Sequence, residues 1–256
     1  LEAYENLSIE KKSDKFQYVF PNFTLSKIID TNLGGNLTYK VSGSNQLSNT
    51  NEKKKSLTND LNYKSKSYIS KYGMISSYDI LLKNATNGGK NIENDKTQSE
   101  NYSSLVFTSS LPLKKESSNF ISNLSPKISA RYNPSSSKEM SDLDRRIDIT
   151  NIFSNNRLGV GSSLEGGQSV TVGFDYKLQN KEDNDLLDIS LGQIFRDKNN
   201  KRLPVKSKMQ TKSSDIAGKF DFFPNNNFKI KYDFSADNNL KNLNYNKIEA
   251  KFKVNN

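Results

Sequence analysis

The chain has 256 residues, only 33% of them hydrophobic, and a formal net charge of +10, with a mean hydropathy of −0.79. So little apolar material would hardly fill the core of an ordinary soluble domain, but it suits strands that each need one apolar face. The sequence contains no cysteine or histidine, which excludes a cysteine nucleophile, a histidine-based triad and a Cys/His zinc site within these residues. No run reaches the roughly 18 apolar residues of a membrane helix.

The basic balance suggests an anionic partner, either nucleic acid or phosphorylated lipid. The lysines, however, are scattered, and the tightest run, NEKKKS at 51–56, reads as the tip of a loop. No arginine cluster or RNA-binding aromatic motif stands out. We therefore expect mostly solvated charges and no nucleic-acid partner.

Strict alternation of apolar and polar residues dominates the chain and predicts strands, because side chains in a strand have period 2. In QSVTVGFDYKL, for example, Val170 and Val172 point away from Ser169 and Thr171. No helical period extends over 12 residues. The expected strands number about twelve and lie near 1–10, 16–28, 33–43, 57–69, 73–84, 101–112, 120–132, 168–179, 186–196, 214–223, 227–236 and 244–254.

The connections between these strands alternate between short and long. Long polar connections are expected at 44–56, 85–100, 133–167 and 197–213, with short turns at 29–32, 70–72, 113–119, 180–185 and 224–226. Outer-membrane barrels show this alternation of tight turns and long external loops.

The predicted fold is therefore all-β: an antiparallel transmembrane β-barrel, of which about 12 strands of a larger barrel lie in residues 1–256 as a single, partial domain. The loop at 133–167 is expected to be external. Pro21 falls inside an expected strand and weakens it. Because the chain starts at Leu1 and stops at Asn256 within an alternating run, we expect an internal piece of a longer protein.

Motifs for chemistry are weak. GVGSSLEGG at 159–167 has Gly-x-Gly spacing, but an alternating strand follows it where a phosphate-binding loop needs a helix. Asp142 and Asp144 could bind calcium through carboxylates, yet Arg145 and Arg146 stand beside them, which favours neutralised loop charges. No serine has a plausible base. We expect no enzyme activity, no metal site and no cofactor.

The segment from NLSPKISARYNP to SSDIAGKFDFFPNNNFKIKYDFSAD resembles the LptD family of lipopolysaccharide-assembly proteins of the Gram-negative outer membrane. The likeness rests on a strand start at a proline, a D-x-T-N-x-F-x-x-N-R loop, an E-G-G return, a G-Q strand and an S-D strand start. The matching residues are Pro126, Asp148, Thr150, Asn151, Phe153, Asn156, Arg157, Glu165, Gly166, Gly167, Gly192, Gln193, Ser214 and Asp215. At 158–163 the chain reads LGVGSS, where the family usually has an Asp-Arg pair, and this leaves that ion pair in question.

The resemblance implies a many-stranded barrel joined to a periplasmic jelly-roll and plugged by a lipoprotein similar to LptE. Lipopolysaccharide would arrive through a periplasmic bridge component bound to the jelly-roll and leave sideways between the first and last strands. This piece would be the middle of the barrel wall, embedded in outer-membrane lipid. The jelly-roll, the lateral gate and the family's disulfide cysteines would lie outside it.

Two questions stay open at this stage. Polar-face lysines Lys177, Lys229 and Lys231 are expected to face the lumen, where they would hold the plug or favour an anionic lipid. The alternative functions are a general outer-membrane porin or passive channel, and a soluble or fibrous β-rich adhesin, neither of which would share the family motifs.

Overall fold

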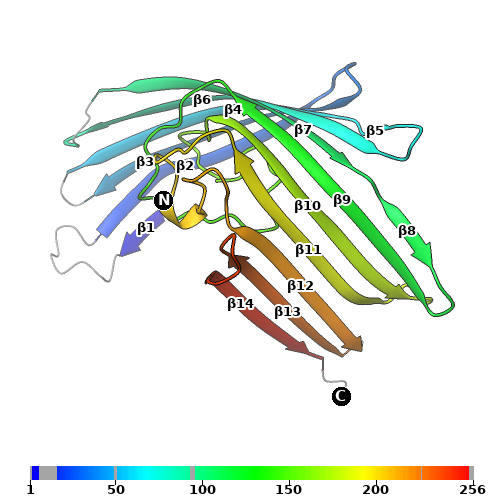
Figure 1. Cartoon of the computed structure of the whole chain (residues 1–256). Helices are drawn as coiled ribbons and strands as arrows, with labels where there is room; N and C mark the ends of the chain where they lie inside the picture. The colour runs from blue at the N-terminus through cyan, green and yellow to red at the C-terminus, as the bar shows by residue number, and fades with distance from the viewer. Residues whose placement is uncertain (1, 6–15, 49–50, 93–95, 226, 254–256) are drawn as a thin grey trace. The chain divides into compact units, whose positions relative to one another are not determined.

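The computed structural model of the chain describes residues 2–5, 16–48, 51–92, 96–225 and 227–253 (Figure 1). Within them, strands follow one another with one short 3-10 helix, η2 (Val205–Ser207). No helix among these residues is long and apolar enough to cross a membrane.

The strands are β1 (Glu2–Glu5), β2 (Phe16–Ile29), β3 (Gly35–Ser48), β4 (Lys53–Ser65), β5 (Tyr68–Ile69), β6 (Ile75–Lys90), β7 (Gln98–Ser110), β8 (Leu113–Glu116), β9 (Phe120–Asn133), β10 (Gly167–Asn180), β11 (Asp185–Arg196), β12 (Ile216–Asn225), β13 (Phe228–Ala236) and β14 (Leu243–Phe252).

The strand order confirms the all-β antiparallel prediction. Strands β1-β2-β3-β4-β6-β7-β9-β10-β11-β12-β13-β14 are neighbours in that order, while β5 pairs with β6 and β8 pairs with β9. The twelve strands of the main order correspond to the twelve expected from alternation. The two additional ones are short: β5 separates from the end of an expected strand, and β8 occupies the turn expected at 113–119.

Two of the expected long loops are wrong. The connection expected at 44–56 is shorter, because β3 continues to Ser48 and β4 starts at Lys53, so Lys53–Lys55 of the NEKKKS run lie in β4 and not at a loop tip. The connection expected at 85–100 likewise shrinks, because β6 continues to Lys90 and β7 starts at Gln98. Polar residues remain in strands here because ladder hydrogen bonds join the backbones, whatever the side chains are.

Prolines occur where a strand ladder is interrupted. The β2–β3 register shifts between Val19 and Asn22, which places Pro21 at an irregularity of the ladder. Pro126 lies in the middle of β9 and not near a strand end as expected. On one side it pairs with Phe174 of β10. On the other side its carbonyl accepts from the N–H of Leu111, in the gap between β7 and β8, so the missing proline N–H falls beside a break in the neighbouring strand.

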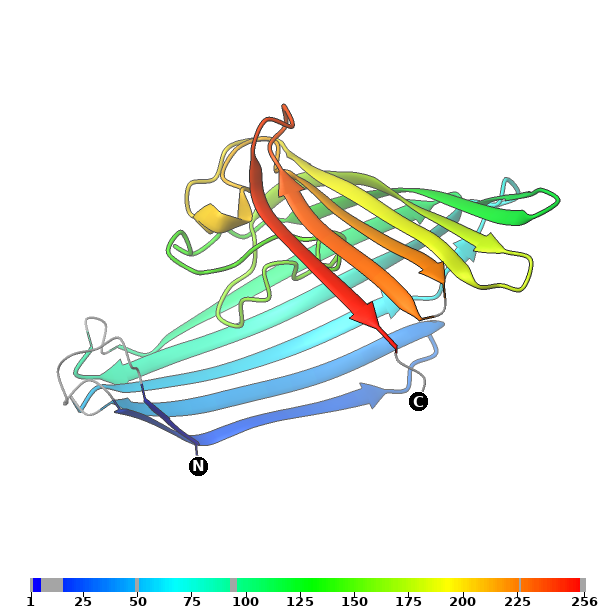
Figure 2. The same cartoon turned by 90° about the horizontal axis from the view of Figure 1, so that it is seen from below.

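The chain divides into two compact units. Unit 1 consists of Leu1–Lys66, Asp79–Ser104 and Val160–Leu164, and unit 2 of Ser67–Tyr78, Leu105–Gly159 and Glu165–Asn256. In unit 1, strands β2, β3 and β4 lie side by side (Figure 2). Leu164 packs there with Leu81, Ala85 and Tyr102 in a small buried cluster.

In unit 2, the exposure of the two sheet faces is the reverse of that in a soluble protein. On β9, Ser129 and Arg131 are 3% and 5% exposed, whereas Ile128 and Tyr132 are 49% and 48% exposed. On β10, Ser169 and Thr171 are buried, while Val170 and Val172 are exposed. Aligned exposed apolar side chains are costly in water and favourable in lipid, so this face is suited to a membrane.

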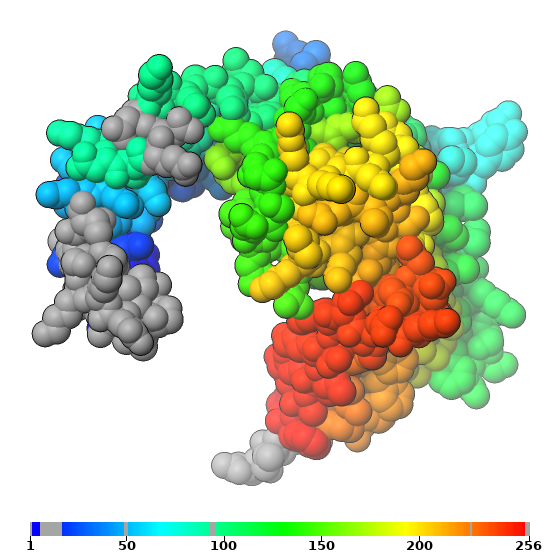
Figure 3. Space-filling model, turned by 60° about the vertical axis from the view of Figure 1, so that its left-hand side comes forward, coloured from blue at the N-terminus to red at the C-terminus, as the bar shows by residue number. Residues whose placement is uncertain are grey.

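Two connecting segments cover the polar face in unit 2. We call residues 134–159 and 165–166 the β9–β10 loop of this unit, and 197–215 the β11–β12 loop. Figure 3 shows the second (yellow) lying against the first (green). Met140 N–H donates to the Arg202 carbonyl at 2.8 Å and Val205 N–H to the Ser141 carbonyl at 3.2 Å. The two loops bury several apolar side chains over the sheet, namely Met140, Ile147, Ile152, Leu158, Leu203 and Met209, and Ile194 of β11 is buried as well.

Candidate functional site

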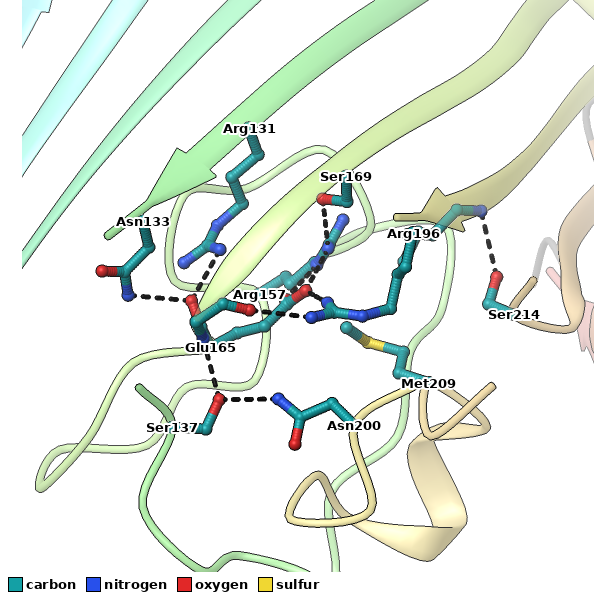
Figure 4. Close-up of polar contacts among 12 residues, drawn as sticks. Arg131, Asn133, Ser137, Arg157, Glu165, Ser169, Arg196, Asn200, Met209 and Ser214 are labelled. Carbon is teal, nitrogen blue, oxygen red and sulfur yellow. Dashed lines mark hydrogen bonds and ion pairs between the residues drawn. The ribbon is translucent and has the colours of Figure 1, made fainter. Parts of the chain in front are cut away.

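Three arginines and one glutamate meet beneath the β9–β10 loop. Arg131 is close to the end of β9 and Arg196 ends β11, while Arg157 and Glu165 come from the loop (Figure 4). All four are buried. We call these residues, Arg131, Arg157, Glu165 and Arg196, the arginine–glutamate cluster. The alternation of the strands places Arg131 and Arg196 on the polar face, and the loop brings the other two onto it.

Arg157 and Glu165 form the centre of the cluster. The Nε and Nη2 groups of Arg157 donate to Oε2 and Oε1 of Glu165, both at 2.6 Å. Arg157 also donates to Ser169 Oγ at 2.8 Å and to Thr171 Oγ1 at 3.2 Å, both on β10. A planar guanidinium fits a carboxylate through two parallel bonds, so this contact fixes orientation as well as charge. The loop is thereby attached to the polar face of β10.

The other two arginines bind mainly the loop backbone. Arg131 donates to the carbonyls of Asn155 at 3.1 Å and Glu165 at 2.7 Å. Arg196 donates to the Glu165 carboxylate and, at 2.7 Å, to the carbonyl of Gly166. The Glu165 carbonyl also accepts from Asn133 Nδ2 at 2.9 Å, so donors from β9 and β11 satisfy several buried carbonyls of the loop backbone. The cluster therefore links β9, β10 and β11 to one loop.

The cluster carries more positive than negative charge. Burial lowers the pKa of the Arg157 guanidinium to about 9, which still leaves it protonated at neutral pH. Three guanidinium groups thus face one carboxylate. Within the described residues, Arg131 Nη2 and Arg196 Nε are buried without a hydrogen-bond partner. Buried N–H groups of a charged side chain seldom remain unbonded.

The E-G-G residues direct the chain from the loop into β10. A methyl group on Gly166 would collide with the carbonyl of Ser135, and the Gly166 N–H donates to Ser137 Oγ at 2.8 Å. Gly167 has a φ of +90° and starts β10 opposite Asn133. Only glycine adopts this backbone conformation readily. Both positions therefore exclude larger residues for backbone reasons.

The D-x-T-N part of the loop forms a local turn. Asp148 Oδ1 accepts from the N–H of Thr150 at 2.8 Å and from its hydroxyl at 2.6 Å. Asn151 in turn accepts from the Asp148 N–H at 3.1 Å and donates to the carbonyl of Arg146. Such turns are the usual use of Asp and Asn side chains beside a loop backbone. They position the next residues, Ile152 and Phe153, toward the sheet.

Those two side chains pack on the sheet. Ile152 is fully buried and lies over Gly192 of β11. Phe153 packs near Gly173, with the Lys127 ammonium 4.9 Å from the ring centroid. Asn156 accepts through its carbonyl from the Gly159 N–H at 3.0 Å. The family-motif residues of the loop therefore act on its folding and docking.

The G-Q and S-D residues lie together where β11 meets the start of β12. Gln193 donates to the carbonyl of Ser214 at 2.9 Å, and Ser214 Oγ accepts from the N–H of Ile194 at 3.0 Å. Asp215 accepts from Ser235 at 3.0 Å and from Asn244 at 2.7 Å, so it ties this point to β13 and β14. These contacts hold the end of the β11–β12 loop.

The three candidate lumen lysines are outside the arginine–glutamate cluster. Lys177 forms a 3.0 Å ion pair with Asp185, and Lys229 a 3.2 Å ion pair with Asp221. Lys231 pairs in register with Asp221 on β12 and Glu249 on β14. Each lies on the polar side of its strand, near carboxylates.

Sequence reasoning missed Arg131 and Arg196, and with them the cluster. A signal was present: the six arginines of this lysine-rich chain all lie between residues 131 and 202. The three arginines of the cluster, Arg131, Arg157 and Arg196, are far apart in sequence, so no cluster is visible until the strands align. Glu165 pairs with Arg157, so the loop contains a buried ion pair although it lacks the family's Asp-Arg at 158–163.

The arginine–glutamate cluster can hold a loop, and its excess positive charge can attract an anion. In the part of the chain that the structure describes, no group of three or more His, Cys, Asp or Glu side chains could hold a metal ion. The cluster lacks a nucleophile beside a base.

An antiparallel sheet with exposed apolar side chains on β9 and β10 and a polar side covered by folded loops has the features of an outer-membrane β-barrel wall, although β1 and β14, at the two ends of the strand order, do not pair with each other in the described residues. The particular family follows from comparison. The family described as LPS transport system D matches residues 1–256, and the chain therefore belongs to the LptD family, whose members serve lipopolysaccharide transport in the outer membrane of Gram-negative bacteria. This confirms the family predicted from the motifs. No curated protein matches the chain.

Proposed function

We propose that this chain forms part of the barrel wall of the translocon that assembles lipopolysaccharide into the outer leaflet of the outer membrane. The observation that carries the proposal is the reversed exposure of β9 and β10, in a chain whose whole length matches a lipopolysaccharide-transport family. Apolar residues such as Ile128 and Val172 would contact acyl chains, and the polar side would face a wet interior. The strands satisfy one another's backbone groups, as lipid requires.

In this proposal the β9–β10 loop is external and closes part of the barrel mouth. The arginine–glutamate cluster fixes it to β9, β10 and β11, so that the loop stays folded without a partner. The single-domain assignment of residues 1–256, an LptE-like plug lipoprotein inside the barrel and a periplasmic bridge component outside this chain belong to the same proposal. So does a role of the lumen lysines in binding the plug.

Depletion and complementation test the function. The full-length gene is placed under a repressible promoter, and newly made lipopolysaccharide is followed by its modification at the cell surface. Depletion should stop surface arrival, and the gene should restore it. A general porin or passive channel predicts the other result: lipopolysaccharide arrives normally, while the purified protein, without any plug, conducts ions in planar bilayers.

A narrower test addresses the lumen lysines. Lys229→Glu reverses a charge on the polar side of β13, and it also removes the pair with Asp221. The matched control is Lys114→Glu, since Lys114 is on the short strand β8 with its side chain 58% exposed. Reduced co-purification of the plug lipoprotein with Lys229→Glu alone is expected. Equal co-purification by both variants would contradict the role of the lysine.

A further inference from the structure

A basic pocket lies beside the arginine–glutamate cluster and shares Arg196 and Gly166 with its loop-holding contacts. It has a volume of about 380 Å³ and is formed in unit 2 by the two covering loops and the adjoining strand ends. Segments 133–137 and 166–168 line one side, and segment 196–200 with Arg202 lines the other. A water molecule occupies about 30 Å³ of liquid volume, so the pocket has room for a small polyatomic ion and several waters.

The charge of the pocket is positive. Arg196, Lys198 and Arg202 line it together with one acidic residue, Asp197. Arg196 is only 7% exposed, and its Nε has no hydrogen-bond partner among the described residues. Arg202 donates one N–H to the Ser137 carbonyl at 3.2 Å, whereas a guanidinium has five N–H donors. Donor capacity and positive charge thus exceed what the surrounding residues use.

The polar side chains at the base of the pocket are held in place. Ser137 Oγ accepts from the Gly166 N–H at 2.8 Å and from Asn200 Nδ2 at 3.0 Å. The side-chain Oδ1 of Asn200 accepts the Arg202 backbone N–H at 3.2 Å, a further restraint on that segment. A site whose donors are already ordered loses little side-chain entropy on binding an ion.

We propose that this pocket binds a tetrahedral oxyanion, namely a phosphoryl group. Guanidinium and ammonium donors bind phosphate oxygens through short charge-assisted bonds, and buried excess positive charge gains most from an anion with several acceptor oxygens. The phosphoryl group could come from free phosphate or from a lipid headgroup. Binding to the pocket does not depend on the transport proposal, because it is measured without export.

Two rim residues provide the test, because replacing buried Arg196 would disturb the cluster itself. Lys198→Ala and Arg202→Ala each remove one charge at the pocket. Lys201→Ala is the matched control, since Lys201 is exposed, carries the same charge on the same loop and does not line the pocket. The full-length protein in detergent is titrated calorimetrically with inorganic phosphate at constant ionic strength, and separately with bisphosphorylated lipid A and with its dephosphorylated form.

Saturable phosphate binding that weakens about tenfold in Lys198→Ala and Arg202→Ala, but not in Lys201→Ala, is the expected result. The same pattern with bisphosphorylated lipid A, absent for inorganic phosphate and dephosphorylated lipid A, also supports the site and identifies a headgroup as the source. Binding of neither ligand overturns the proposal. An affinity for phosphate that falls equally in all three variants also overturns the proposal, because the loss would then reflect the net charge of the protein only. If lipopolysaccharide export is not restored while phosphate still binds, the proposed transport function is contradicted and the proposed phosphoryl site is not.

Discussion

The arginine–glutamate cluster and the charged group around Asp221 lie on the same polar side of neighbouring strands, yet they are built differently. In the first, Arg157 and Glu165 have side chains that are both 2% exposed. In the second, Lys219 and Lys229 each approach Asp221 to 3.2 Å, with their side chains 28% and 27% exposed. Both partners of an ion pair are buried only in the first group, where a folded loop supplies two of the charged residues.

This difference shows what the loop contributes. Arginine donors fixed by a bidentate contact suit a site without water, whereas lysine keeps a hydrated ammonium on a flexible stem and can turn to solvent. Asp221 is itself 2% exposed, and its Oδ1 has no hydrogen-bond partner in the described residues. We therefore expect the first group to determine stability and the second to contribute mainly charge.

Glu165→Gln should have the largest effect. It would leave three buried arginines without their carboxylate, and removing one partner of a buried ion pair costs about 3–5 kcal/mol. The free energy of unfolding of the full-length protein, from urea titration in detergent followed by heat-modifiable gel mobility, measures the loss. Glu182→Gln is the control, because Glu182 lies on the exposed turn between β10 and β11, and it should change stability by less than about 0.5 kcal/mol. Equal effects of the two variants would show that the cluster does not hold the fold.

Asp221→Asn should have a smaller effect, about 1 kcal/mol or less, because its lysine partners remain partly hydrated and can move into water. High salt separates the two groups more sharply. A salt concentration of about 1 M shortens the Debye length to about 3 Å, which screens exposed charges much more than buried ones. The loss from Asp221→Asn should therefore shrink in high salt, while that from Glu165→Gln persists. If salt left the stability loss of Asp221→Asn unchanged, Asp221 would behave like the buried arginine–glutamate cluster, and the proposed difference between the two groups would be contradicted.

The sequence predicts the strands well and the cluster poorly, for one physical reason. Alternation is local, so Val170 and Ser169 reveal their strand and their faces without knowledge of any partner. The ends of β3 and β4 were missed because their polar residues are typical of loops, although strand pairing keeps them extended. Arg131 and Arg196 are 65 positions apart in the chain, and only the register of β9, β10 and β11 brings them together.

The contact between the two covering loops should give the smallest effect. Asp144 and Lys206 form a 2.6 Å ion pair with side chains 68% and 52% exposed. The hydrogen bond from Lys206 is the main cause that lowers the pKa of Asp144 below its ordinary value of 3.8. A lowered folded-state pKa stabilises the fold when pH is above the ordinary value, and this contribution disappears as pH falls through the lowered one.

Asp144→Asn should therefore cost little stability at neutral pH, and nothing in buffer acidic enough to protonate the native carboxyl. Paired urea titrations of the native protein and the variant at both pH values measure the difference. Asp142→Asn is the control for removing a charge two residues away. If Asp144→Asn were as destabilising as Glu165→Gln, the two loops would depend on their mutual contact, and the arginine–glutamate cluster would not suffice to hold the β9–β10 loop on the sheet.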